Sequence, residues 1–331
     1  MADAALRSLR FRLERQSTWE KLDALLTQVE KRSPQSLSDE DMLAIPALYR
    51  ATLSSLSVAR ATSLDAALVD YLEALCARAY FFVYGPRTTL MERVSDFFIR
   101  GWPWAVRAMW RETIASTLIM AAAVAAAFFL VKSDPAFYFS FVPQELAQGR
   151  DTTASAEELR ATLYQQLDPE ASLATFATFL FTHNAQISIF SFALGVAFCL
   201  PSVLLIAYQG AMLGAMFAVF EGHGLGWQFG GWIFIHGVTE LFAIILSGAA
   251  GIRIGWAVAF PGQRTRLQAA EQAGREGGLV MIGVVIMLMI AGLLEGFARQ
   301  LIQLDLARWS IAGASAVIWA LYFYIRPGPP K

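Results

Sequence analysis

The chain has 331 residues, of which 56% are hydrophobic, and its 26 Lys and Arg side chains against 27 Asp and Glu side chains give a formal charge of -1. This apolar fraction exceeds that of ordinary soluble domains and indicates a membrane protein. The near-zero charge argues against nucleic acid as a partner, and two cysteines, Cys76 and Cys199, match neither a disulfide framework nor a zinc motif.

Residues 1–100 are rich in charges of both signs and have no signal-peptide-like apolar stretch, so we expect a cytoplasmic helical domain there. A start signal at Ser38 predicts one of its helices, and Pro46 is expected to limit how far that helix extends. A second, core-facing helix is predicted by apolar residues at helical spacing, namely Leu68, Leu72, Leu75 and Ala79.

Residues 101–112 combine tryptophans with arginines. Indole rings favour the membrane interface, where one side is wet and the other apolar, so Trp102, Trp104 and Trp110 predict an amphipathic segment lying along the membrane surface. Ordinary packing of a cytoplasmic helix is the alternative.

Residues 113–326 are predicted to form a transmembrane domain of six helices with an external loop at 132–172. The run at 113–131 is uncharged and long enough to cross a hydrocarbon core of roughly 30 Å. Pro201 divides a longer apolar run, because proline lacks the backbone N–H that a continuing helix needs. The other predicted spans are 178–200, 202–220, 229–252, 277–298 and 309–325. The fold class is therefore an all-α polytopic membrane protein.

Arg and Lys in short flanks are retained on the cytoplasmic side during insertion. They precede the first span, lie between the fourth and fifth, and follow the last, whereas the loop at 132–172 is rich in acids. Both termini are therefore expected in the cytoplasm. Arg299 and Arg308 are the exceptions to this pattern.

Three of the predicted spans carry buried polar groups. In "WIFIHGVTELFAIILSGAAG", residues 232–251, His236 and Glu240 are one turn apart on the same helix face. His183 and Asn184 lie near the start of the second span, and Glu295 lies near the end of the fifth, at a similar outer depth. Ionisable groups in a membrane face the bundle interior and one another, so these five residues are predicted to form an intramembrane polar cluster.

Two imidazoles and two carboxylates match a site for zinc or another divalent cation, with His183, His236, Glu240 and Glu295 as ligands. They match a proton relay or a hydrogen-bonded packing group equally well, and spacing does not separate the three. The chain contains neither H-E-x-x-H nor G-x-S-x-G, so no catalytic residue is assigned.

Glycines recur three or four residues apart in two spans, a spacing that lets membrane helices approach closely. They predict packing faces, either within the bundle or between copies of a homo-oligomer such as a dimer. These residues are Gly210, Gly214, Gly248, Gly251 and Gly255.

The ordered segments "HNAQISIFSFALGVAFCLPSVLLIAYQGAMLGAMF", "HGVTELFAIILSGAAGIRIGWAVAFPGQRTR" and "LLEGF" resemble the stage II sporulation protein M family over about residues 173–300. "LYRATLSSLSVARA" resembles the cytoplasmic region of its non-sporulating bacterial members. The resemblance implies a bacterial inner-membrane scaffold or assembly factor with envelope proteins as partners. A transporter or channel that passes an ion or small solute through the polar cluster is the alternative, and an intramembrane hydrolase comes third.

Overall fold

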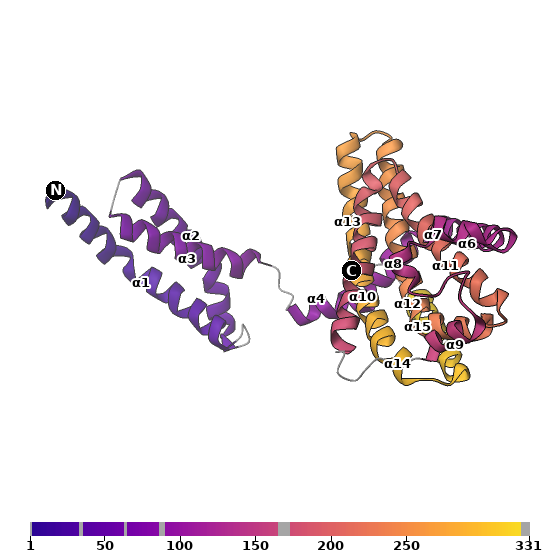
Figure 1. The fold of residues 1–331 in the computed structure, drawn as a ribbon. Helices are drawn as coiled ribbons and strands as arrows, with labels where there is room; N and C mark the ends of the chain where they lie inside the picture. The colour runs from indigo at the N-terminus through magenta and orange to yellow at the C-terminus, as the bar shows by residue number, and fades with distance from the viewer. Residues whose placement is uncertain (1, 33–35, 63–64, 86–89, 165–172, 326–331) are drawn as a thin grey trace. The chain divides into compact units, whose positions relative to one another are not determined.

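The computed structural model describes residues 2–32, 36–62, 65–85, 90–164 and 173–325, and every regular element in these ranges is a helix. The all-α fold class is thereby confirmed. The chain divides into two compact units, Met1–Leu90 and Met91–Lys331 (Figure 1).

The first unit consists of three helices, α1 (Ala2–Arg32), α2 (Asp39–Ala61) and α3 (Ala66–Tyr84), packed around one apolar core. The predicted row on α3 is buried in this core together with Trp19 and Leu22 from α1 and Ile45 from α2. The helical periodicity therefore identified the inner face of α3 correctly.

Helix α2 begins as predicted, because the Ser38 side chain accepts a hydrogen bond from the Asp41 backbone N–H. The expectation that Pro46 limits this helix is wrong, since α2 continues to Ala61. An interior proline costs about 3 kcal/mol in a helix. Pro46 lies on the exposed face, while Ile45 and Tyr49 beside it are buried, so core packing offsets the missing hydrogen bond.

The second unit begins with α4 (Leu90–Asp96), a π-turn (Phe97–Gly101) and α5 (Trp102–Ala108). The long helix α6 (Trp110–Ser133) leads into short helices at Pro135–Phe137, α7 (Tyr138–Phe141), α8 (Gln144–Ala147) and α9 (Ala156–Tyr164). The remaining helices are α10 (Leu173–Ala193), a short turn at Leu194–Val196, α11 (Leu200–Gly222), α12 (Gly226–Ala259), α13 (Arg266–Leu293), a π-turn at Leu294–Ala298, α14 (Arg299–Leu301) and α15 (Asp305–Tyr324).

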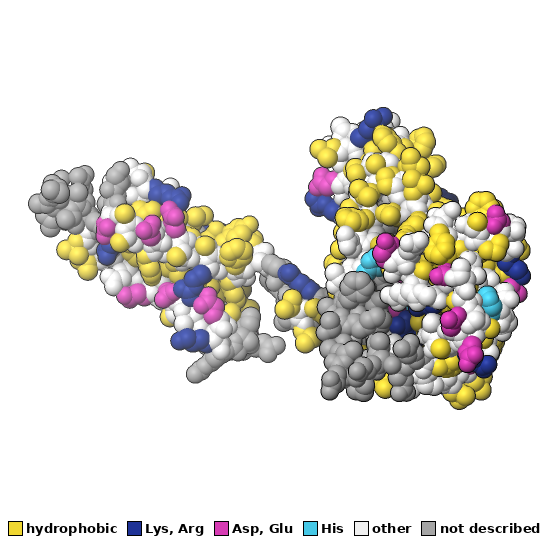
Figure 2. Space-filling view, viewed as in Figure 1, with side chains coloured by type: hydrophobic (Ala, Val, Ile, Leu, Met, Phe, Trp, Pro, Cys, Tyr) yellow, Lys and Arg dark blue, Asp and Glu magenta, His cyan; other side chains and the backbone are white. Residues whose placement is uncertain are grey.

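Six helices in the described ranges are long and apolar enough to cross a membrane. Five of them correspond to predicted spans: α6, α11, α12, the continuous helix Arg266–Leu301, and α15. The sixth is α2, which the sequence placed in a cytoplasmic domain, whereas α10 is not among the six. Figure 2 shows hydrophobic side chains over much of the surface where α13 lies in Figure 1. On α13 itself Leu279, Ile282 and Met289 are exposed, as expected of a helix that faces lipid.

Helix α12 is the central element of the second unit and packs against α6, α10, α11, α13 and α15. In its most apolar stretch 61% of residues are buried, against 17% for α15. A group placed midway along α12 is therefore surrounded by protein.

The predicted packing glycines lie at helix contacts within the chain. Any Cβ at Gly210 or Gly214 would collide with the α6 backbone at Met120 or Val124. Gly248 meets the side chain of Ile206, Gly251 meets the backbone of Ser191, and Gly255 meets the backbone of Cys199. These contacts fix α11 against α6, and α12 against the ends of α10 and α11 that flank the predicted break at Pro201.

The three tryptophans of the segment 101–112 differ in burial. Trp102 is buried against Gly283 of α13 and touches the rings of Trp319 and Phe323, so it packs as a core residue. The absence of a side chain at Gly283 opens the slot that this indole ring fills, and the interfacial position of the segment 101–112 stays a prediction. Trp104 and Trp110 are exposed.

Candidate functional site

Three of the predicted cluster residues meet in the second unit. His236 and Glu240 lie one turn apart on α12, and Glu295 reaches them from the end of α13. His236 Nε2 is 4.0 Å from Glu240 Oε2 and 3.7 Å from Glu295 Oε1. One ligand atom from each residue lies within 4.8 Å of the other two. The predicted gathering of His236, Glu240 and Glu295 is confirmed.

A local irregularity presents Glu295 to α12. The helix that begins at Arg266 widens into a π-turn at Leu294–Ala298 before it continues as α14. Such a turn inserts one residue per turn and rotates the following side chains relative to a regular helix, and it recurs at functional sites. The orientation of Glu295 and of the residues after it therefore depends on a backbone irregularity that the amino-acid types do not predict.

Arg299 is a member of the site that sequence reasoning missed. Its Nη1 donates a 2.7 Å hydrogen bond to Glu295 Oε1, and its guanidinium lies 4.4 Å from the centre of the Trp232 ring, one turn before His236 on α12. The signal was present as a Glu and an Arg four residues apart, which face each other on a helix. Arg299 is also one of the two basic residues that do not fit the predicted cytoplasmic location of the basic flanks.

The cluster is shielded from its surroundings. His236 is 2% exposed, Glu295 and Arg299 are each 7% exposed, and the Glu240 side chain is 17% exposed. His236 Nδ1 has no hydrogen-bond partner among the residues that the structure describes. The site therefore holds two carboxylates, one guanidinium and one imidazole with an unused nitrogen.

The other two predicted members lie on α10, which contacts the π-turn that carries Glu295. His183 is exposed and Asn184 is half-buried, and His183 is not among the three residues whose ligand atoms lie within 4.8 Å of one another. Their membership of the cluster stays a prediction.

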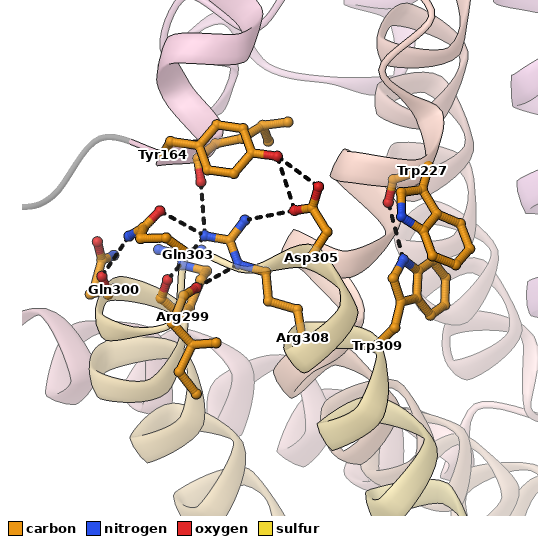
Figure 3. Close-up of polar contacts among 10 residues, drawn as sticks. Tyr164, Trp227, Arg299, Gln300, Gln303, Asp305, Arg308 and Trp309 are labelled. Atoms are coloured by element: carbon orange, nitrogen blue, oxygen red, sulfur yellow. Dashed lines mark hydrogen bonds and ion pairs between the residues drawn. The ribbon is translucent and has the colours of Figure 1, made fainter.

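Beside the cluster, Arg308 fastens the segment between α14 and α15 to α9 (Figure 3). Arg308 is fully buried, and its guanidinium donates hydrogen bonds to the backbone oxygens of Ile302, at 2.7 Å, and Leu163, at 3.0 Å. The Tyr164 hydroxyl bonds both carboxylate oxygens of Asp305 at 2.9 Å. The described part of the predicted external loop, residues 132–164, is thereby tied to the end of the bundle where the cluster lies.

The same segment also reaches Trp232. Arg150 lies 5.5 Å from the centre of that ring, and its backbone oxygen accepts a 2.5 Å hydrogen bond from the Tyr138 hydroxyl. Burial raises the pKa of Tyr138 to about 12, so its hydroxyl remains a donor throughout the physiological pH range. Two guanidinium groups, those of Arg150 and Arg299, therefore lie close to the Trp232 ring.

A family model described as Stage II sporulation protein M matches residues 116–298, more than half of the chain. The chain belongs to the stage II sporulation protein M family. The family domain contains His236, Glu240 and Glu295 and ends one residue before Arg299. The resemblance inferred from the sequence is confirmed.

Residues 9–85 match a second family, a domain of unknown function, DUF8413, which coincides with the three-helix unit. No curated protein and no solved structure matches the chain. This member of the stage II sporulation protein M family thus joins a family membrane domain to a separate helical domain.

Proposed function

We propose that this stage II sporulation protein M family member is a scaffold of the bacterial inner membrane. The observation that carries the proposal is the ion pair of Arg299 with Glu295, buried under Trp232. The hydrogen bond from Arg299 and the contact of Arg299 with Trp232 hold Glu295 in a fixed position inside the bundle. A charged group that is held in this way suits a static structure better than a site that exchanges a passing solute.

The glycine contacts support a rigid bundle. Transport by alternating access requires one group of helices to rock against another. In this chain α11 contacts the backbone of α6 at Gly210 and Gly214, and α12 contacts backbone near the ends of α10 and α11 at Gly251 and Gly255. Any sliding of these helices must open several close-packed contacts at once, which favours a static platform.

A scaffold needs surfaces for partners, and this chain offers one on each side under the proposed topology. With both termini in the cytoplasm, the three-helix unit faces the cytoplasm and the segment 132–172 faces outward. Envelope proteins are the proposed partners, and assembly into homo-oligomers would multiply these surfaces.

Reconstitution into liposomes tests the proposal. Vesicles that contain a pH-sensitive or cation-sensitive dye are subjected to an ion gradient, and flux is compared with that of protein-free vesicles. The scaffold predicts equal flux. Flux that requires the purified protein and disappears in Glu240→Gln contradicts the proposal.

Ion or proton translocation is the second candidate, and a specific observation favours it. Besides His236 Nδ1, the buried hydroxyls of Ser188 and Ser191 have no hydrogen-bond partner among the described residues. Ser191 lies against Gly251, about 16 Å along α12 from Glu240 at 1.5 Å per residue. Unpaired hydroxyl groups farther along the bundle from the charged cluster suit a polar path for an ion or a proton. Protein-dependent flux in the liposome experiment would support this second candidate.

A further inference from the structure

We propose that His236, Glu240 and Glu295 bind one divalent metal ion of the zinc class. The proposal is independent of the scaffold function, because a structural ion would strengthen a platform and a transported or catalytic ion would serve another role. It follows from the charge of the cluster, the separations of its ligand atoms and the chemistry of those atoms.

Charge shows that the cluster attracts a cation. With a neutral imidazole and both carboxyl groups ionised, the two carboxylates and the Arg299 guanidinium sum to -1 within a buried site. An uncompensated buried charge is costly, so the cluster gains from binding either a proton or a metal ion. Charge alone does not choose between them.

The distances favour a metal ion over a proton shared between His236 and a carboxylate. A shared proton requires a donor and acceptor about 2.5 to 3.2 Å apart. His236 Nε2 is 4.0 Å from the Glu240 oxygen and 3.7 Å from the Glu295 oxygen, too far for a hydrogen bond. With these two separations, and the third no longer than 4.8 Å, a point equidistant from the three ligand atoms is at most about 2.5 Å from each, and zinc needs about 2.0 to 2.2 Å. An inward movement of a few tenths of an ångström completes the coordination.

The donor set selects the kind of ion. Carboxylates alone suit magnesium or calcium, whereas an imidazole among them favours zinc, iron or nickel. Three protein ligands leave a fourth position open, as in zinc sites that bind an exogenous group.

Arg299 acts as a positioning residue for Glu295. Metal-bound carboxylates are themselves held by hydrogen bonds from an outer shell of residues. Glu295 Oε1, which accepts the hydrogen bond from Arg299 Nη1, is also the oxygen nearest His236 Nε2. A carboxylate oxygen has two lone pairs, so Oε1 can accept from Arg299 with one and bind the ion with the other.

Metal analysis tests the proposal. Protein purified without chelators or a metal-affinity step is analysed by mass spectrometry of its elements, and we expect close to one equivalent of zinc or a similar ion per chain. Glu240→Gln, which is nearly isosteric, should lose the ion while keeping its elution volume on size exclusion. His183→Ala and His223→Ala, which alter exposed histidines, should retain it.

A second measurement covers an ion that is lost during purification. Chelator-treated protein is titrated with Zn²⁺, Fe²⁺, Ni²⁺ and Ca²⁺, and its unfolding temperature is followed. At a free ion concentration near 100 times Kd, one of the first three should raise the unfolding temperature by about 5 to 10 °C, and Glu240→Gln should abolish the rise. Purified protein without metal that shows no shift with any ion overturns the proposal, as does loss of the ion in either histidine control.

Discussion

The Glu295–Arg299 ion pair gives the sharpest energetic prediction, because the same helix carries a matched exposed pair. Glu271 and Arg275 have the same order and the same four-residue spacing, with an N–O distance of 2.6 Å against 2.7 Å for the buried pair. Arg275 is 80% exposed, whereas the Arg299 side chain is 7% exposed. The two pairs therefore differ mainly in burial.

Replacement of Arg299 by Met keeps the aliphatic stem and removes the charge. The loss combines a charged hydrogen bond, about 1.5 to 3 kcal/mol, with the contact to Trp232, about 0.5 to 2 kcal/mol. We expect Arg299→Met to lower the free energy of unfolding by about 2 to 5 kcal/mol, and Arg275→Met by no more than about 1 kcal/mol.

The assay is equilibrium unfolding in mixed detergent micelles, with a chelator present so that no bound ion contributes. The double variant Arg299→Met/Glu295→Gln should lose at least about 1 kcal/mol less than the sum of the single losses, because the pair is already broken in each. Equal losses in Arg299→Met and Arg275→Met, or additive losses at Arg299 and Glu295, would refute the reasoning.

Three further predictions concern topology, packing and the attachment of the outer segment. In a chain without Cys76 and Cys199, Ala154→Cys should react with an impermeant thiol reagent from outside and Gln268→Cys only from inside; the reverse result would invert the topology. Gly251→Ala should lower stability by about 1 to 3 kcal/mol in the micelle assay, whereas Gly278→Ala, with open space around it, should not; equal effects would deny close packing at Gly251. Arg308→Met should lower the free energy of unfolding by about 3 kcal/mol or more and speed hydrogen exchange in α9, whereas Tyr164→Phe should lower it by about 1 kcal/mol. Unchanged hydrogen exchange in α9 would contradict the proposal that Arg308 holds α9 in place.

The sequence predicts the cluster better than its surroundings, for a physical reason. An ionisable group within a membrane span is costly unless it faces the bundle, so depth alone brought His236, Glu240 and Glu295 together. The same argument includes His183, which is exposed on α10 and whose membership of the cluster stays a prediction, because depth does not fix which face of a helix is inward.

Features that depend on tertiary contacts could not be predicted. The π-turn at Leu294–Ala298 has no residue signature, and the buried position of Arg299 follows from it. Trp102 lies in a segment whose tryptophans and arginines are typical of a membrane interface. It is buried because Gly283, far along the chain, has no side chain and leaves room for the indole ring. Pro46 lies inside α2 because the core around Ile45 outweighs its local cost.

The central claim is that the bundle is closed around its charged cluster, and the access of water to the cluster's depth tests it most directly. Ala243 is fully buried and lies one turn beyond Glu240 on α12. The variant Ala243→Cys is made in a chain without Cys76 and Cys199 and is treated in vesicles of both orientations with a small water-soluble thiol reagent. Ala156→Cys, at an exposed position, is the positive control. The scaffold predicts that Ala243→Cys stays unmodified while Ala156→Cys is fully labelled, and comparable rates at the two positions would contradict the account.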